Sequence, residues 1–146
     1  MPSVNLQIIS LGPVIDVHIG VSSPRRLAME HAKLEIPKPV KCRLLIDTGA
    51  SGTCVDSSII KQLSLTPSGV VDIHTPSTSA GNTHSCNQYD TSLIILHPAL
   101  NRIFQAIPVI ESQFSHQGID GLLGRDILKS CLFIYNGELG IYTLSF

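Results

Sequence analysis

The clearest pattern of apolar and polar positions near the start of the chain is an alternation over residues 13–20, PVIDVHIG. Such a period of two is typical of a half-buried strand, with one side formed here by Ile15, Val17 and Ile19. The segment before it, 4–11, is also rich in strand-forming residues. We expect the two segments to pair with each other.

Residues 23–35 carry the signals of a short helix between strands. Ser23 is expected to cap the helix, Pro24 suits its first turn, and the prolines of 37–39 end it. A second short helix is predicted over 57–63, where Asp56 stands at the capping position.

Further strands are predicted from apolar runs that turn residues separate. Residues 40–47 form a strand whose consecutive aliphatic residues indicate burial on both faces, and the last residue of this strand is Asp47. Residues 70–74 and 83–96 predict a long hairpin with a polar, glycine-bearing tip. The remaining elements are a strand at 104–111, a tight apolar turn at 118–124, a short helix at 125–130 and a hairpin at 131–144 around Asn136-Gly137. The pattern predicts an all-β domain in the form of a small closed barrel.

Composition limits the classes of protein to consider. The 146 residues are 43% apolar and 14% charged with a net charge of -1, so we expect a single domain over residues 1–146 with its own core. A near-neutral chain gives no electrostatic reason to expect nucleic acid or an anionic membrane as a partner. Because no apolar run approaches the ~20 residues of a membrane span and the start lacks the pattern of a signal peptide, we expect a soluble, cytoplasmic protein.

Cysteine and histidine spacing points to neither a disulfide framework nor a metal site. The four cysteines lie far apart without a C-x-x-C pair, and the six histidines show no metal-ligand spacing. We therefore predict reduced thiols, no metal and no cofactor.

The stretch with the most chemical information is LLIDTGASGTCVD, residues 44–56. It delivers one carboxylate from a buried strand directly into a glycine turn. Taken alone, Asp47 could simply hydrogen-bond its own turn, as aspartate often does before glycine. A second stretch, GLLGRDIL at 121–128, changes the interpretation.

Together, IDTGAS and GLLGRDIL resemble the motifs of the retropepsins, the retroviral and retroviral-like aspartic proteases, and the resemblance runs from about residue 40 to the C-terminus. It implies a closed barrel with a flap hairpin and one or two short helices. It also implies that Asp47 is catalytic within Asp47-Thr48-Gly49, that Thr48 braces two such loops across a dimer, and that Leu122, Leu123 and Gly124 pack beneath the aspartate. The final hairpin becomes a candidate for the dimer interface.

Hydrolysis of a peptide bond without metal needs one group to activate water and another to protonate the carbonyl oxygen, which two carboxylates sharing a proton supply. Only one Asp-Thr-Gly is present, and neither Asp120 nor Asp126 resembles a second copy. We therefore expect a homodimeric aspartic endopeptidase that acts on extended peptides. The alternative is a dimeric peptide-binding module of the same fold with little or no activity.

The resemblance also suggests residues that contact substrate. These are Ala50 and Ser51 beside the aspartate and, at the tip of the flap, Ala80, Gly81 and Asn82. Ser51 departs from the retroviral members, which commonly carry there an acid that pairs with the arginine equivalent to Arg125. Arg125 then has three possible situations: pairing with Asp126, pairing with the other subunit, or simple solvation.

Overall fold

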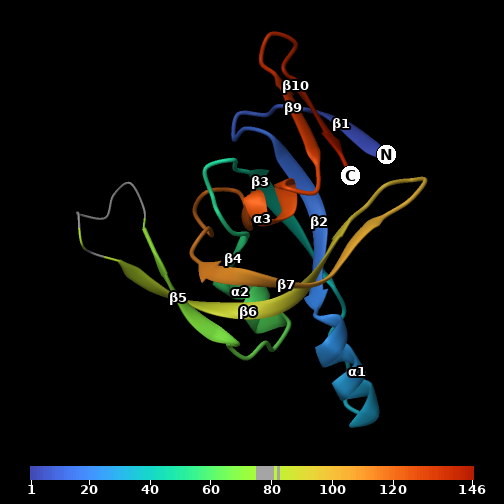
Figure 1. Cartoon of the computed structure of the whole chain (residues 1–146), viewed down its shortest axis with the longest axis vertical. Coiled ribbons are helices and arrows are strands. Elements are labelled where there is room, and N and C mark those ends of the chain that lie inside the picture. The colour runs from blue at the N-terminus through green and yellow to red at the C-terminus, as the bar shows by residue number, and fades with distance from the viewer. Residues whose placement is uncertain (75–80, 82) are drawn as a thin grey trace.

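The computed structural model describes residues 1–74, 81 and 83–146 of the chain (Figure 1). In chain order the elements are β1 (Ser3–Gln7), β2 (Val14–Val21), α1 (Ser23–His31), β3 (Val40–Ile46), β4 (Cys54–Asp56), α2 (Ser57–Gln62), β5 (Gly69–Ile73), β6 (His84–Ile95), β7 (Arg102–Ser112), β8 (Gly121–Leu123), α3 (Arg125–Leu128), β9 (Leu132–Asn136) and β10 (Ile141–Ser145). Strands dominate, as the sequence predicts.

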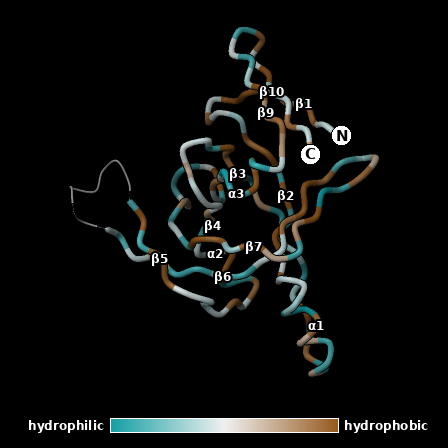
Figure 2. Tube along the Cα trace, viewed as in Figure 1, coloured by the Kyte–Doolittle hydropathy of each residue, from teal (hydrophilic) through white to brown (hydrophobic). Residues whose placement is uncertain are grey.

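Six of the strands form a closed barrel, which confirms the predicted architecture. The sheet runs in the order β2-β3-β8-β4-β7-β6, and β2 pairs again with β6 to close it, while β5 extends the sheet beside β6. Alternate residues of these strands point into one core, where the side chains of Val17, Ile19, Leu44, Val55 and Leu93 have no exposed surface. In Figure 2 hydrophobic stretches accordingly run along the strands of the barrel.

A second sheet of three strands stands beside the barrel, in the order β1-β10-β9. The expectation that residues 4–11 pair with 13–20 is therefore wrong, because β1 pairs instead with the C-terminal strand β10, with Val4 opposite Leu144. Both segments have strand character, but the alternation of one strand does not specify its partner. The two ends of the chain are consequently joined in one sheet.

Two local predictions need correction. Residues 118–124 are not simply a turn, since Gly121–Leu123 form β8, which pairs in parallel with β3 and in antiparallel orientation with β4. The cap of α1 is Ser22 rather than Ser23. The predicted turn after Asn136 is present, and it is held by a hydrogen bond of 3.0 Å from the Leu139 amide to the Asn136 side chain.

The start of α2 agrees with prediction and links two parts of the barrel. Asp56 is 6% exposed, and its carboxylate accepts hydrogen bonds from the backbone amides of Ser58 at 2.9 Å and Phe114 at 2.7 Å. Burial by itself would raise the pKa of the Asp56 carboxyl, but the amide hydrogen bonds outweigh burial, so the pKa lies below its ordinary value of 3.8. The ionised carboxylate therefore stabilises the fold.

We expect Asp56→Asn to lower the free energy of unfolding by about 2 kcal/mol at neutral pH, because the amide leaves one of the two N–H donors without an acceptor. A carboxyl whose pKa is depressed on folding stabilises above its unfolded pKa and loses that effect as pH falls through the folded value. The difference between the two proteins should shrink below about pH 4. Urea unfolding at neutral pH and at about pH 3 measures it, and a difference that is constant with pH would contradict this account.

No helix in the part of the chain that the structure describes is both long and apolar enough to cross a membrane.

Candidate functional site

Asp47 follows the last residue of β3, and backbone hydrogen bonds from both sides hold this end of the strand in place. The Ile46 amide donates to the Pro13 carbonyl at 2.9 Å, and the Asp47 amide donates to the Leu123 carbonyl at 3.1 Å. Ile46 and Leu123 are buried, whereas Asp47 itself is half-buried. A buried strand thus presents a carboxylate at its open end, as the sequence predicts.

The turn after β3 folds back on the aspartate. The Gly49 amide donates to Asp47 Oδ1 at 2.8 Å, and the Ala50 amide donates to the Asp47 carbonyl at 3.2 Å. A Cβ on Gly49 would lie 3.1 Å from Asp47 Oδ1, so glycine is favoured because the carboxylate itself occupies the nearby space. Thr48 and Gly49 are both exposed.

The second motif packs directly against this turn, and two glycines make the close approach possible. A Cβ on Gly124 would lie 2.5 Å from the Gly52 carbonyl carbon, and one on Gly121 would lie 2.0 Å from the Cys54 oxygen. Leu123 between them has no exposed surface and Leu122 is half-buried. The second motif thus packs against the loop that carries Asp47. The role of Leu122, Leu123 and Gly124 in supporting a catalytic aspartate stays a prediction.

Arg125 is neither paired with Asp126 nor simply solvated. Its Nη1 donates to the carbonyl oxygens of Thr48 at 2.8 Å and Gly49 at 3.0 Å, and its backbone amide donates to the Ala50 carbonyl at 2.9 Å. In the described part of the chain the ion pairs that are formed join Asp16 with Lys41 and Arg43 and do not include Arg125. The guanidinium therefore binds the backbone of the loop that carries Asp47.

Asp126 lies in the first turn of α3, and its side chain also binds the end of the loop that carries Asp47. Its carboxylate accepts hydrogen bonds from the Thr53 amide at 3.1 Å and the Thr53 hydroxyl at 2.8 Å. The same hydroxyl oxygen accepts from the Gly124 amide at 3.2 Å. Thr53, which is fully buried, thus ties the end of the aspartate loop to the second motif.

Sequence reasoning did not single out Thr53, and it gave no role to Gly121, the first residue of the second motif. A threonine directly after a glycine, as Thr53 is after Gly52, has no distinctive local pattern. Its role becomes visible only when Asp126 is brought beside it from 73 positions away.

The residues predicted to contact substrate are placed only in part. Ala50 is half-buried and Ser51 is exposed, both next to Asp47 in the loop. Gly81 is exposed and has a φ of 89°, a conformation that glycine adopts readily. Ala80 and Asn82 lie outside the described residues.

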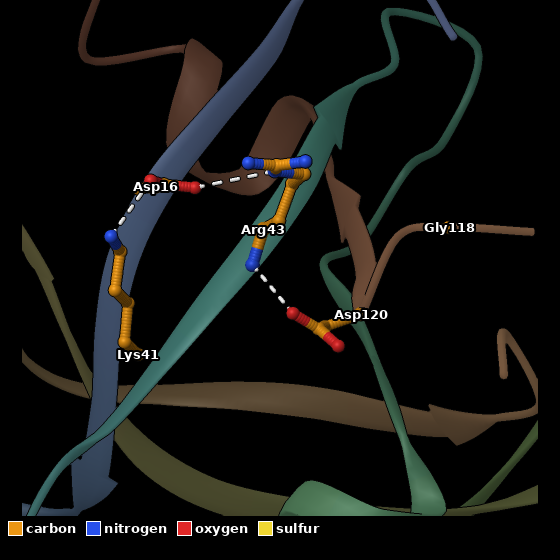
Figure 3. Close-up of a pocket in the computed structure, with 5 residues that line it drawn as sticks. All are labelled: Asp16, Lys41, Arg43, Gly118 and Asp120. Atoms are coloured by element: carbon orange, nitrogen blue, oxygen red, sulfur yellow. Dashed lines mark hydrogen bonds and ion pairs between the residues drawn. The ribbon is translucent and has the colours of Figure 1, made fainter.

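A charged pocket lies on β2 and β3, and Asp120 belongs to it (Figure 3). Asp16 pairs with Lys41 at 3.1 Å and with Arg43 Nε at 3.6 Å, while Asp120 accepts a hydrogen bond of 2.7 Å from the Arg43 amide. Figure 3 shows the side chain of Asp16 directed toward those of Lys41 and Arg43, and the side chain of Asp120 directed toward the backbone amide of Arg43. Both acids are thus engaged in local structure.

The thiols are poorly suited to nucleophilic chemistry at neutral pH. Burial raises the pKa of Cys42 to about 12, and burial together with nearby carboxylates raises that of Cys54 to about 11. All four cysteines are free. Among the residues that the structure describes, no group of three or more histidine, cysteine or acidic side chains is arranged to hold a metal ion.

Comparisons with known proteins agree with this geometry. Residues 32–127, which include the first motif and all but the last residue of the second, match the family model described as "Aspartyl protease". No curated protein sequence matches the chain.

Among solved structures, a retropepsin-like aspartic protease from Rickettsia conorii matches with a TM-score of 0.61 and 16% identity, over 99% of this chain and 90% of that one. The retroviral protease-like domain of Ddi1 from Leishmania major has a TM-score of 0.38 and 15% identity, over 84% and 81% of the two chains. The first comparison shows a shared fold, and the second is too distant to carry an argument.

Proposed function

Because the chain belongs to the aspartyl protease family and has the retropepsin-like fold, we propose that it is an endopeptidase that hydrolyses peptide bonds as a homodimer. In this proposal residues 1–146 form one domain, and each subunit contributes Asp47 to a shared site. The coverage of 99% of the chain by a single retropepsin-like structure supports the single domain.

The observation that carries the proposal is the presentation of Asp47. The carboxylate is fixed at one oxygen by the Gly49 amide, and among the described residues the other oxygen accepts no hydrogen bond. It stands in the Asp-Thr-Gly sequence at the open end of a buried strand. A rigid carboxylate with one uncommitted oxygen is suited to binding a water molecule or sharing a proton.

The chemistry requires a second carboxylate, for which the partner subunit is the source. Two carboxyl groups placed close together do not both ionise, because their negative charges would repel each other. The ionised Asp47 therefore accepts a proton from water, while the protonated Asp47 of the other subunit donates its proton to the substrate carbonyl oxygen. The water oxygen then bonds to the carbonyl carbon. The resulting tetrahedral intermediate breaks its C–N bond as a proton passes to the leaving nitrogen. Thr48 and Gly49 are exposed in the single chain and are available for contact across the two-fold axis.

The three-stranded sheet supports a dimer as well. Its edge strand β9 exposes half or more of Leu132, Ile134 and Tyr135, at 53%, 51% and 56% of their surfaces. Unpaired apolar edge strands are uncommon on monomers because they associate readily. We infer that this edge lies in the interface between subunits.

Incubation of the purified protein with a complex peptide mixture tests the proposal. We expect cuts within peptides, identified by mass spectrometry, that persist in a strong chelator, together with a dimer in sedimentation. A dimer that binds peptides but makes no cuts would favour the alternative, a peptide-binding module. A strictly monomeric protein that cleaves peptides would contradict the shared site.

The hairpin of β5 and β6 is proposed as a flap over the substrate. The two strands pair from Gly69 opposite Gln88 to Ile73 opposite His84 and extend away from the barrel (Figure 1). A hairpin in this position can close on an extended peptide, exclude water and donate backbone hydrogen bonds.

Deletion of residues 78–83 should therefore reduce peptide cleavage by about a hundredfold, since the substrate is no longer held in place. The melting temperature and the dimer should change little. A matched control is a shortened tip of the β6–β7 hairpin, residues 98–100, which extends from the other side of the barrel in Figure 1. Equal rates in the two deletion variants would refute the role of the flap.

A further inference from the structure

Arg125 is the first residue of α3, and it reaches back to the loop that carries Asp47. Through its side chain and its backbone amide it binds three consecutive carbonyl groups, those of Thr48, Gly49 and Ala50. The distances are 2.8, 3.0 and 2.9 Å. The arginine is exposed in the single chain, so its ordering comes from these bonds rather than from burial.

The peptide group between Thr48 and Gly49 is bonded on both sides. Its oxygen accepts from Arg125 Nη1 at 2.8 Å, and its N–H donates to Asp47 Oδ1 at 2.8 Å. A donor on the oxygen of an amide polarises the amide and strengthens the hydrogen bond that its N–H makes. A chain of two hydrogen bonds therefore joins the guanidinium, through one peptide group, to the carboxylate.

We propose that Arg125 is a positioning residue for Asp47, and that it acts through this peptide group. The cation fixes the orientation of the Thr48–Gly49 peptide, and the peptide fixes the orientation of the carboxylate. The catalytic consequence rests on the proposed function, whereas the chain of hydrogen bonds does not.

Local charges agree with this role. Ser51 in the loop has no charge with which the guanidinium could form an ion pair. The carboxylate of Asp126, the neighbour of Arg125, accepts hydrogen bonds from Thr53 instead. Arginine suits the task because its planar group holds donors in fixed directions, so that one nitrogen binds two carbonyls at once. Lysine would keep the charge without this geometry.

The amide proton of Gly49 reports directly on the proposed link. Hydrogen bonding to a carboxylate moves an amide proton downfield, and Asp47→Asn defines the position without the charged acceptor. In Arg125→Gln we expect the Gly49 resonance in a ¹⁵N–¹H spectrum to move part of the way toward the position in Asp47→Asn. Arg43→Gln is the matched control: it removes an exposed arginine of β3 whose side chain binds Asp16, and it should leave Gly49 unmoved.

Kinetics supply the second measurement. If Asp47 is misdirected, kcat should fall about tenfold or more in Arg125→Gln, while KM stays within about twofold because the substrate contacts remain. Arg125→Lys should recover part of both kcat and the Gly49 shift. If Arg125→Gln does not fold, Arg125→Lys carries the same two measurements, with intermediate changes expected relative to wild type.

An unmoved Gly49 resonance in a folded Arg125 variant would overturn the proposal and leave Arg125 as a purely structural brace. A wild-type protein that cleaves no peptide but shows the Gly49 shift on Arg125 substitution would instead overturn the proposed function and keep this link.

Discussion

Replacing Asp47 with asparagine is expected to reduce peptide cleavage by at least about a thousandfold, because the amide can neither accept the proton of water nor share one with its counterpart. The fold should be retained. Asparagine has nearly the same shape, and its oxygen can still accept the Gly49 hydrogen bond that now measures 2.8 Å. The value of kcat/KM on a peptide identified from the mixture provides the measurement.

Asp120→Asn is the matched control for this substitution. Like Asp47, Asp120 is adjacent to the end of a barrel strand, since it directly precedes β8. Its carboxylate accepts a hydrogen bond of 2.7 Å from the Arg43 amide in the charged pocket, and the side-chain oxygen of asparagine can replace it there. Its kcat/KM should stay within about twofold of wild type, a change too small for loss of a reacting group. Comparable losses in both variants, or none in either, would contradict the assignment of Asp47.

The second large effect is expected from Gly124→Ala. The added Cβ would lie 2.5 Å from the Gly52 carbonyl carbon and 2.6 Å from its oxygen, and backbone atoms cannot move aside as the end of a side chain can. We expect a loss of about 3 kcal/mol in the free energy of unfolding. Cleavage should fall too, because the loop of Asp47 packs on this segment.

Gly69→Ala provides the comparison, since a Cβ at Gly69 in β5 meets no atom within 4 Å. Its unfolding free energy should lie within about 0.5 kcal/mol of wild type in urea. Equal free energies of unfolding for Gly124→Ala and Gly69→Ala would contradict the claim that the close packing of the two motifs requires glycine at position 124.

Much of the fold follows from local pattern, and the corrections concern long-range pairing. The alternation of 13–20 marks β2 correctly, and Asp56 caps α2 as expected. The pairing of β1 with β10, in place of the expected pairing with β2, brings the two ends of the chain together, and no local pattern predicts such a contact. Residues 121–123 are predicted as part of a turn because a strand of three residues that begins with glycine is too short to show a period.

The site divides in the same way. Two short motifs predict Asp47, Gly124 and Arg125 as residues of the site, and the structure brings those motifs into contact. Thr53 and Asp126 could not be joined from sequence, since each has an ordinary local explanation and their hydrogen bonds span the fold. The hydrogen bonds from Arg125 to backbone carbonyl oxygens could not be predicted from sequence either, because every residue has a carbonyl group and the sequence pattern does not show which one is bound.

The central claim, one site built from two copies of Asp47, is tested most directly by mixing subunits. Wild type and Asp47→Asn are combined in varying ratio at constant total protein, allowed to exchange subunits, and assayed for cleavage. If each site needs Asp47 from both subunits, activity follows the square of the wild-type fraction, so an equal mixture retains about one quarter of the activity. Activity that falls in direct proportion, to about one half, would mean that each chain works alone and would contradict the account.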